Sequence, residues 1–168
     1  MTHDTISFEA FEERHRVPVI DIFNHYIRTG TAAFRREEVG FDHFDKYLAN
    51  AHELCGYAIL DERRTVIGFC QLKPWADHDT FAHTAEVAYF LKPEAIGRGI
   101  GSIILERLIA DAARMKKRQL LATISGENEA SLRFHRKHGF TECGRFRKVG
   151  NKFGRDFDVV FMQRTIGV

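Results

Sequence analysis

The part of the sequence that most constrains the fold is a strand, a glycine-rich turn, a helix and a second strand in direct succession. "TAEVAYFLKP" is rich in β-branched and aromatic residues and ends at Pro93. Gly97, Gly99 and Gly101 follow within five positions, and aliphatic residues then recur at helical spacing up to the basic stop "KKR". "QLLATIS" is a continuous apolar run, typical of a central buried strand. A unit of this kind joins two parallel strands by a crossover helix.

The rest of the chain predicts elements that arrive in consecutive runs. "TISFEAF" alternates like an edge strand, and "GYAILDERRTVIGFCQL" has two strand-forming runs around a polar turn. Helices are expected over residues 17–27, 41–48 and 128–138, and final strands around residues 140–146 and 157–163. Asn128 is expected at the N-cap of the last helix and Gly139 at its end. The pattern predicts one α/β domain over residues 1–168, with a mixed, mostly antiparallel sheet and one parallel pair.

Composition limits the class of protein. The net charge of +2 argues against nucleic acid as the main partner, and the hydrophobic fraction of 44% is that of an ordinary globular protein. No apolar run approaches the length of a membrane span, and the first residues include acids where a signal peptide is basic and then apolar. The three cysteines lack metal-ligand or redox spacing, which favours reduced thiols. We expect a soluble, cytoplasmic protein without a membrane or nucleic-acid partner.

A glycine turn that opens a helix gathers backbone N–H groups at the positive end of the helix dipole, which attracts phosphate. Ser102 could add a hydroxyl in the first turn. A glycine turn that merely lets strand and helix pack is an equal alternative, since short glycine patterns are weakly specific. Two phosphate-binding classes fail on spacing. A nucleotide P-loop needs Lys and then Ser or Thr after its last glycine, and a dinucleotide fold needs its third glycine one residue after Gly101.

Several segments carry a resemblance to a known family. "GRGIGSIILERLI", followed by "LLATISGENEASLRFHRKHGF", resembles the GNAT superfamily of acetyl-CoA-dependent N-acyltransferases. "FNHYIRTGTAAF", "PWADHDTFAHTAEVAY" and "VGNKFGRDFDVVFMQ" resemble the phosphinothricin and methionine sulfoximine acetyltransferases. The resemblance implies a splayed sheet flanked by helices, acetyl-CoA bound where two parallel strands part, a small amine or amino-acid acceptor, and a homodimer. The final strands, with "KFGRDFD", are where we expect the dimer interface.

The resemblance also implies which residues contact acetyl-CoA. The pyrophosphate is expected on the loop and the first helical turn, the thioester on the main chain of the preceding strand, and the pantetheine arm on the cap of the last helix. These residues are Phe90, Leu91, Ile96, Gly97, Arg98, Gly99, Ile100, Gly101, Ser102 and Asn128. Ile96 departs from the family, which usually has Arg or Gln there, so loop shape depends on the backbone alone.

Acetyl transfer to an amine needs a base for the amine, an oxyanion partner and a proton for the departing thiolate. Glu86 matches the family's proposed base, and its apolar neighbours could raise the pKa of a carboxyl group. His135 stands where most GNAT enzymes have a tyrosine that protonates the sulfur. Without the resemblance, Glu86 is an ordinary strand-end glutamate and His135 a helix histidine bonded to a carbonyl. His138 lies one turn from His135, but spacing supplies no third ligand, so no metal is expected.

The resemblance places Phe34, Trp75, His78 and Phe81 around the acceptor. His78 and Phe81 stand where phosphinothricin enzymes carry Arg and Tyr, and the sulfoximine enzymes also have Phe at the second position. Asp156 replaces the tryptophan of the family's "KFGRW". We therefore expect an N-acetyltransferase for a small amino acid or an analogue such as methionine sulfoximine. The alternatives are another amine (a protein N-terminus, lysine or a polyamine) and a non-catalytic CoA-binding module, against which the presence of both Glu86 and His135 argues.

Overall fold

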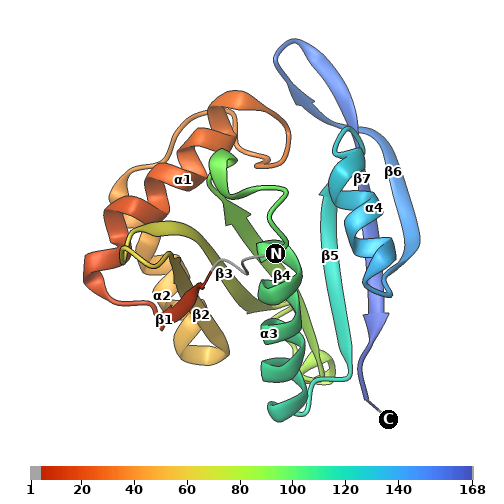
Figure 1. Ribbon diagram of the computed structural model, residues 1–168. Helices are drawn as coiled ribbons and strands as arrows, with labels where there is room; N and C mark the ends of the chain where they lie inside the picture. Colours follow the sequence, from red (N-terminus) through yellow and green to blue (C-terminus); the bar gives the residue numbers. More distant parts are fainter. Residues whose placement is uncertain (1–4, 168) are drawn as a thin grey trace.

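The computed structural model describes residues 5–167, which form a seven-stranded mixed sheet in the order β1-β2-β3-β4-β5-β7-β6 (Figure 1). The strands are β1 (Ser7–Ala10), β2 (Cys55–Leu60), β3 (Val66–Pro74), β4 (Thr84–Leu91), β5 (Gln119–Ser125), β6 (Thr141–Lys152) and β7 (Arg155–Thr165). Only β4 and β5 pair in parallel among them, and the other neighbours are antiparallel. The predicted fold class, edge strand, central hairpin and single crossover are confirmed. The boundaries of the domain at residues 1 and 168 lie outside the described residues and stay a prediction.

The helices cover both faces of this sheet and create two cores. They are α1 (Arg16–Thr29), α2 (Phe44–Glu53), α3 (Ile100–Arg114) and α4 (Glu129–Lys137). Alternate residues of β2 and β3 point to opposite faces: Ile59 and Leu72 pack in the core under α3 and α4, whereas Ala58 and Phe69 pack in the core under α1 and α2. A side chain on the central strands therefore belongs to the α1/α2 face or to the α3/α4 face according to its register.

The sheet splits in its middle. The β4–β5 pairing has only three positions, of which Glu86 opposite Leu121 is the last. Beyond it, β4 stays paired with β3 as far as Leu91, and β5 stays paired with β7 as far as Ser125. Figure 1 shows β4 and β5 moving apart toward their carboxyl ends. Beyond this point, the main-chain groups of β4 and β5 that face the gap no longer pair with each other.

The last two strands are longer than the sequence predicted. The expected strands around residues 140–146 and 157–163 are in fact one long hairpin, in which β6 starts after Phe140 and runs to Lys152. Phe153 and Gly154 join the strands, with φ of +54° and +73°. A two-residue turn with both φ positive matches the twist of a hairpin. Most of β6 is exposed, so its sequence lacks the alternation that marks a half-buried strand.

Candidate active site

The split exposes a row of main-chain groups on β4. Lys92 N–H donates to the Ile67 carbonyl over 2.7 Å. Because amides alternate direction in an antiparallel ladder, Phe90 faces β3, and the N–H groups that face the gap are those of Val87, Tyr89 and Leu91. Of the two predicted main-chain donors, Leu91 therefore faces the gap and Phe90 faces β3.

The side chains of Tyr26 and Phe90 fix the end of β4. The Tyr26 hydroxyl of α1 donates to the Leu91 carbonyl over 2.5 Å. The Phe90 ring packs on the α1/α2 face against Phe69, with ring centroids 5.5 Å apart. These contacts support the end of β4, where β5 no longer pairs with it.

Glu86 lies at the point where the strands part. It is four residues before Phe90 on the same strand, so both side chains point to the α1/α2 face. Its carboxylate is not surrounded by apolar groups alone, because Oε2 lies 3.1 Å from Nζ of Lys73 on β3. Lys73 is the residue directly opposite Glu86 in the β3–β4 register. The Glu86 side chain is 15% exposed, so it can be reached from solvent while it remains paired.

His135 lies on α4, on the other face of the sheet, and is only 4% exposed. Its Nδ1 is 2.8 Å from the Ser131 carbonyl, which can only accept, so Nδ1 carries the proton. Nε2 therefore accepts a 2.7 Å hydrogen bond from the Tyr89 hydroxyl. Burial lowers the pKa of His135, with the Ser131 carbonyl opposing the shift, and burial raises the pKa of Tyr89. The pair consists of a neutral imidazole and a neutral phenol at neutral pH.

The glycine segment forms the turn into α3. Gly97 and Gly99 have φ of +80° and +81°, a left-handed conformation that side chains rarely adopt. No heavy atom lies within 4 Å of a Cβ built at either position, so the surface beside them is open. Gly99 is the N-cap and has no side chain to cap the helix, so no side chain at the cap accepts the first N–H groups of α3. Ile96 is exposed on the same loop, two residues before Arg98.

Ser102 and Asn128 already have partners inside the protein. The Ser102 hydroxyl donates to Nε2 of His138 over 3.1 Å, because Nδ1 of His138 donates to the Phe134 carbonyl. Asn128 is the N-cap of α4, and its Oδ1 accepts the Ser131 N–H over 3.1 Å. The predicted capping role of Asn128 is confirmed, and its predicted role toward pantetheine stays a prediction.

Three of the predicted acceptor residues lie together after β3. Trp75 and Phe81 meet edge to face with centroids 4.9 Å apart, and His78 lies 6.4 Å from Phe81. Trp75 remains 44% exposed. The cluster is an accessible aromatic wall at the end of the strand that carries Lys73.

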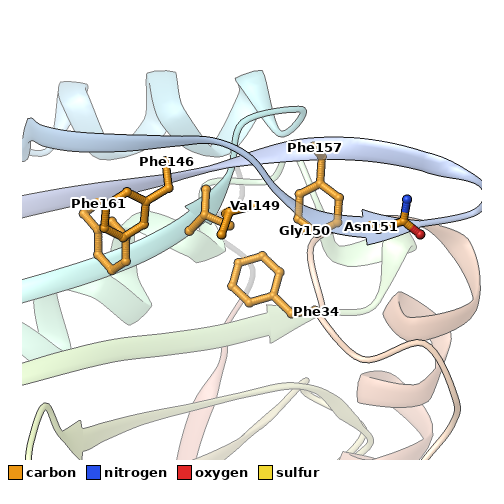
Figure 2. A pocket seen from close by; sticks show the side chains of 8 residues that line it. Phe34, Phe146, Val149, Gly150, Asn151, Phe157 and Phe161 are labelled. Atoms are coloured by element: carbon orange, nitrogen blue, oxygen red, sulfur yellow. The ribbon is translucent and has the colours of Figure 1, made fainter.

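Phe34 lies apart from that cluster, in the loop after α1. Its ring stacks on Phe157 of β7 with centroids 6.0 Å apart. Together with the β6–β7 hairpin it lines a groove of about 350 Å³, and Figure 2 shows its ring facing Val149 and Phe157. The groove is lined by Phe34, Phe146, Val149, Gly150, Asn151, Phe157, Val159 and Phe161.

The same loop is fastened to the hairpin by polar contacts. Lys152 is 2% exposed, and its Nζ donates to the carbonyls of Gly30 (2.7 Å) and Ala33 (2.9 Å). Thr31 shares a 2.7 Å hydrogen bond with Ser125 at the end of β5. The loop that follows α1 and the far half of the sheet are thus joined across the wide end of the split.

The sequence did not single out Tyr89, Lys73 or Lys152. Strand alternation could have placed Tyr89 on the face opposite Glu86. Lys73 and Lys152 look like ordinary surface lysines in sequence, since nothing local reveals which residue lies across the sheet. Among residues 5–167, no group of three or more His, Cys, Asp or Glu residues could hold a metal ion. The expected absence of a metal in the reaction stays a prediction.

A splayed β4–β5 pair, an open glycine turn at the start of α3 and a carboxylate at the fork match one family of enzymes. The family model described as "Acetyltransferase (GNAT) family" matches residues 19–140. The chain belongs to the GNAT family of acetyltransferases, and it is an N-acetyltransferase.

Known members of the family are similar over most of the chain. The L-amino acid N-acyltransferase MnaT of Escherichia coli is 33% identical over 147 residues, which cover 86% of this chain and 85% of that protein. The L-methionine sulfoximine/L-methionine sulfone acetyltransferase of Salmonella typhimurium is 34% identical over 86% of this chain and 85% of its own. The crystal structure of a phosphinothricin acetyltransferase from Sinorhizobium meliloti, in complex with AcCoA, has a TM-score of 0.91 at 26% identity and covers 97% of this chain and 89% of that one.

Proposed function

We propose that this chain transfers the acetyl group of acetyl-CoA directly to the amino group of a small amino acid or amino-acid analogue. The observation that carries the proposal is Glu86 at the last paired position of β4 and β5, where a base would meet a thioester bound in the gap. The relatives support it, since the Escherichia coli protein is named for L-amino acids and the Sinorhizobium meliloti enzyme holds AcCoA.

The two faces of the sheet divide the chemistry. Glu86, on the α1/α2 face, takes a proton from the acceptor ammonium, and the freed nitrogen forms a bond with the thioester carbon. A main-chain N–H of Tyr89 or Leu91 donates to the oxyanion. The C–S bond then breaks and the nitrogen of the new amide releases its surplus proton to solvent. The thiolate leaves on the α3/α4 face, where it takes a proton from the Tyr89 hydroxyl, which His135 resupplies. The pyrophosphate binds the turn from Ile96 to Ser102, with Gly97 and Gly99 allowing its close approach.

The acceptor enters on the α1/α2 face between the aromatic wall and the loop that carries Phe34. Trp75 and Phe81 supply apolar area for a side chain, and the His78 ring lies beside Phe81. The loop from Trp75 to His83 contains no arginine. We therefore propose a sulfoximine or sulfone in preference to phosphinothricin, whose phosphinate adds a second negative charge.

A thiol-release assay with acetyl-CoA tests the function. The panel holds free amino acids, methionine sulfoximine and sulfone, phosphinothricin, polyamines and a short peptide with a free N-terminus. We expect the highest kcat/KM with an amino acid or sulfone. Turnover confined to polyamines or peptides would favour another acceptor class, and CoA binding without turnover of any amine would favour a binding module.

We also propose a cytoplasmic homodimer. Support for the dimer is the β6 edge, where Phe146 and Val149 are exposed apolar side chains next to the groove of Phe34. Cys55 and Cys70 are buried unpaired thiols, as in a reducing compartment. None of the helices among residues 5–167 is long and apolar enough to cross a membrane. Light scattering should give the mass of a dimer for wild type and a lower mass for Val149→Asp. Val17→Asp, on the exposed surface of α1, is the control and should keep the dimer mass. A monomeric wild type would reject the dimer.

A further inference from the structure

Lys73 is the charged neighbour of the proposed base. Its Nζ lies 3.1 Å from Oε2 of Glu86, and the two residues face each other across an antiparallel pair. Both side chains lie on the α1/α2 face, where α2 supplies Asn50 to the next residue of that row, Gln71. The Lys73 side chain is 37% exposed, so its ammonium is accessible to a ligand.

Two other cations on the side of the loop after α1, Lys152 and Arg36, already have partners. Lys152 is buried against the carbonyls of Gly30 and Ala33. Arg36 donates to the backbone and side chain of Asn151. The loop at residues 75–83 contains two aspartates and no lysine or arginine. Among residues 5–167, Lys73 is the cation that forms an ion pair with the proposed base.

We propose that Lys73 binds the α-carboxylate of the acceptor while Glu86 binds its α-ammonium, so that a zwitterion exchanges partners with the Lys73–Glu86 ion pair. This inference rests on the proposed function and names its acceptor class, free α-amino acids. An α-amino acid carries its ammonium and its carboxylate group on the same carbon. The Lys73–Glu86 ion pair presents the two opposite charges in contact. On binding, the Lys73 ammonium exchanges the Glu86 carboxylate for the carboxylate of the acceptor, and Glu86 exchanges Lys73 for the ammonium of the acceptor. No buried charge therefore loses an oppositely charged partner. The flexible stem of lysine allows the ammonium to follow the carboxylate.

The exchange discriminates between acceptors. A simple amine pulls Glu86 away from Lys73 and returns no anion to the lysine. A peptide N-terminus does the same, because its carboxyl group is an amide. Both acceptors leave the ammonium of Lys73 without its carboxylate in a partly buried site, which costs binding free energy. A free amino acid avoids this cost.

The experiment compares two acceptors that differ only in the carboxylate, methionine sulfone and 3-(methylsulfonyl)propylamine, in wild type, Lys73→Met and Lys73→Arg. We expect Lys73→Met to raise KM for methionine sulfone about tenfold or more, which is about 1.4 kcal/mol, with kcat changed little. KM for the amine should change less than about threefold by the same measure. Lys73→Arg should keep the preference for the amino acid. Lys46→Met, on the exposed surface of α2, is the matched control and should behave as wild type.

Each outcome separates this inference from the function beneath it. Equal losses for both acceptors in Lys73→Met, or a shift of the pH profile of kcat that is the same for both, would make Lys73 a structural or electrostatic support of Glu86 and overturn carboxylate binding. A wild type that prefers the amine would also overturn it while leaving acetyl transfer intact. A wild type that binds acetyl-CoA and acetylates neither acceptor, nor any amine of the wider panel, would reject the function itself.

Discussion

The Tyr89 hydroxyl donates a 2.7 Å hydrogen bond to Nε2 of His135, whose Nδ1 is held by the Ser131 carbonyl. Both ring nitrogens of His135 are therefore occupied by groups of the protein. A proton that passes from His135 to a departing thiolate has to travel through the Tyr89 hydroxyl, and only the imidazolium form can start that transfer. Burial makes this form scarcer by lowering the pKa of His135.

Removal of either member of this pair should cost a similar factor in kcat, on the order of tenfold and below the range typical of a well-placed general acid. Tyr89→Phe, His135→Ala and the double variant test this. If the two residues act as one unit, the double variant loses no more than the worse single variant. The defect should shrink with an acyl donor whose thiol is more acidic. If the losses in kcat were additive and did not depend on the acidity of the donor thiol, the two residues would not act as one unit.

The same histidine should make stability depend on pH. Because burial lowers the pKa of folded His135, the unfolded chain takes up a proton near pH 6.5 that the folded chain does not. The free energy of unfolding therefore falls as the pH drops below about 6.5, until the pH passes the folded pKa. Urea unfolding at pH 7.5, 6.5 and 5.5 should show a smaller fall in His135→Gln. Burial also lowers the pKa of His43, so part of the fall in stability should remain in His135→Gln. If the free energy of unfolding of His135→Gln fell with pH as much as that of wild type, the assignment to His135 would be wrong.

Glu86→Gln removes the proposed base and nearly preserves its shape. We expect kcat at pH 7 to drop by about 100-fold or more, since a positioned base commonly contributes that much. Acetyl-CoA affinity, measured by calorimetry, should stay near that of wild type. A higher pH should restore part of the rate because it deprotonates the amine in solution. Near wild-type kcat across the pH range would place the base elsewhere.

Gly99→Val should weaken CoA binding about tenfold or more, or 1.4 kcal/mol. The built Cβ meets nothing within 4 Å, so the cause is the left-handed φ of +81° and the covering of helix N–H groups. Gly144→Val is the matched control, since that Cβ also meets nothing and φ there is not positive. Calorimetry should find the control like wild type. Unchanged affinity in a folded Gly99→Val protein would exclude the turn as the pyrophosphate site.

Lys152→Met should loosen the loop that carries Phe34. Two carbonyls, those of Gly30 and Ala33, lose a buried ammonium donor, which costs about 1–3 kcal/mol for each unsatisfied polar group. We expect a lower Tm and a higher acceptor KM, with acetyl-CoA affinity unchanged because the glycine turn lies elsewhere. Lys148→Met, on an exposed part of β6, is the control. An unchanged acceptor KM together with a lower Tm would limit Lys152 to stability.

The sequence by itself determined the elements whose pattern is local. The two-residue alternation of β2 and β3, the helical spacing of α3 and the glycines before it each depend on neighbours within one or two turns of chain. The same is true of Asn128 at the cap of α4. These patterns fixed one crossover in a mainly antiparallel sheet, and with it the place of Glu86 on the strand before the crossover. The motifs of the family then pointed to acetyl transfer.

The tertiary structure alone decided which side chains meet. The register of β3 against β4 puts Lys73 beside Glu86, and the packing of α4 on the sheet brings His135 to Tyr89. The length of the β6–β7 hairpin brings Lys152 to the loop after α1. Such partners lie far apart in sequence, and their pairing depends on the packing of the whole chain. A single sequence carries no local signal of that packing, because a paired lysine and a solvated lysine have the same neighbours along the chain.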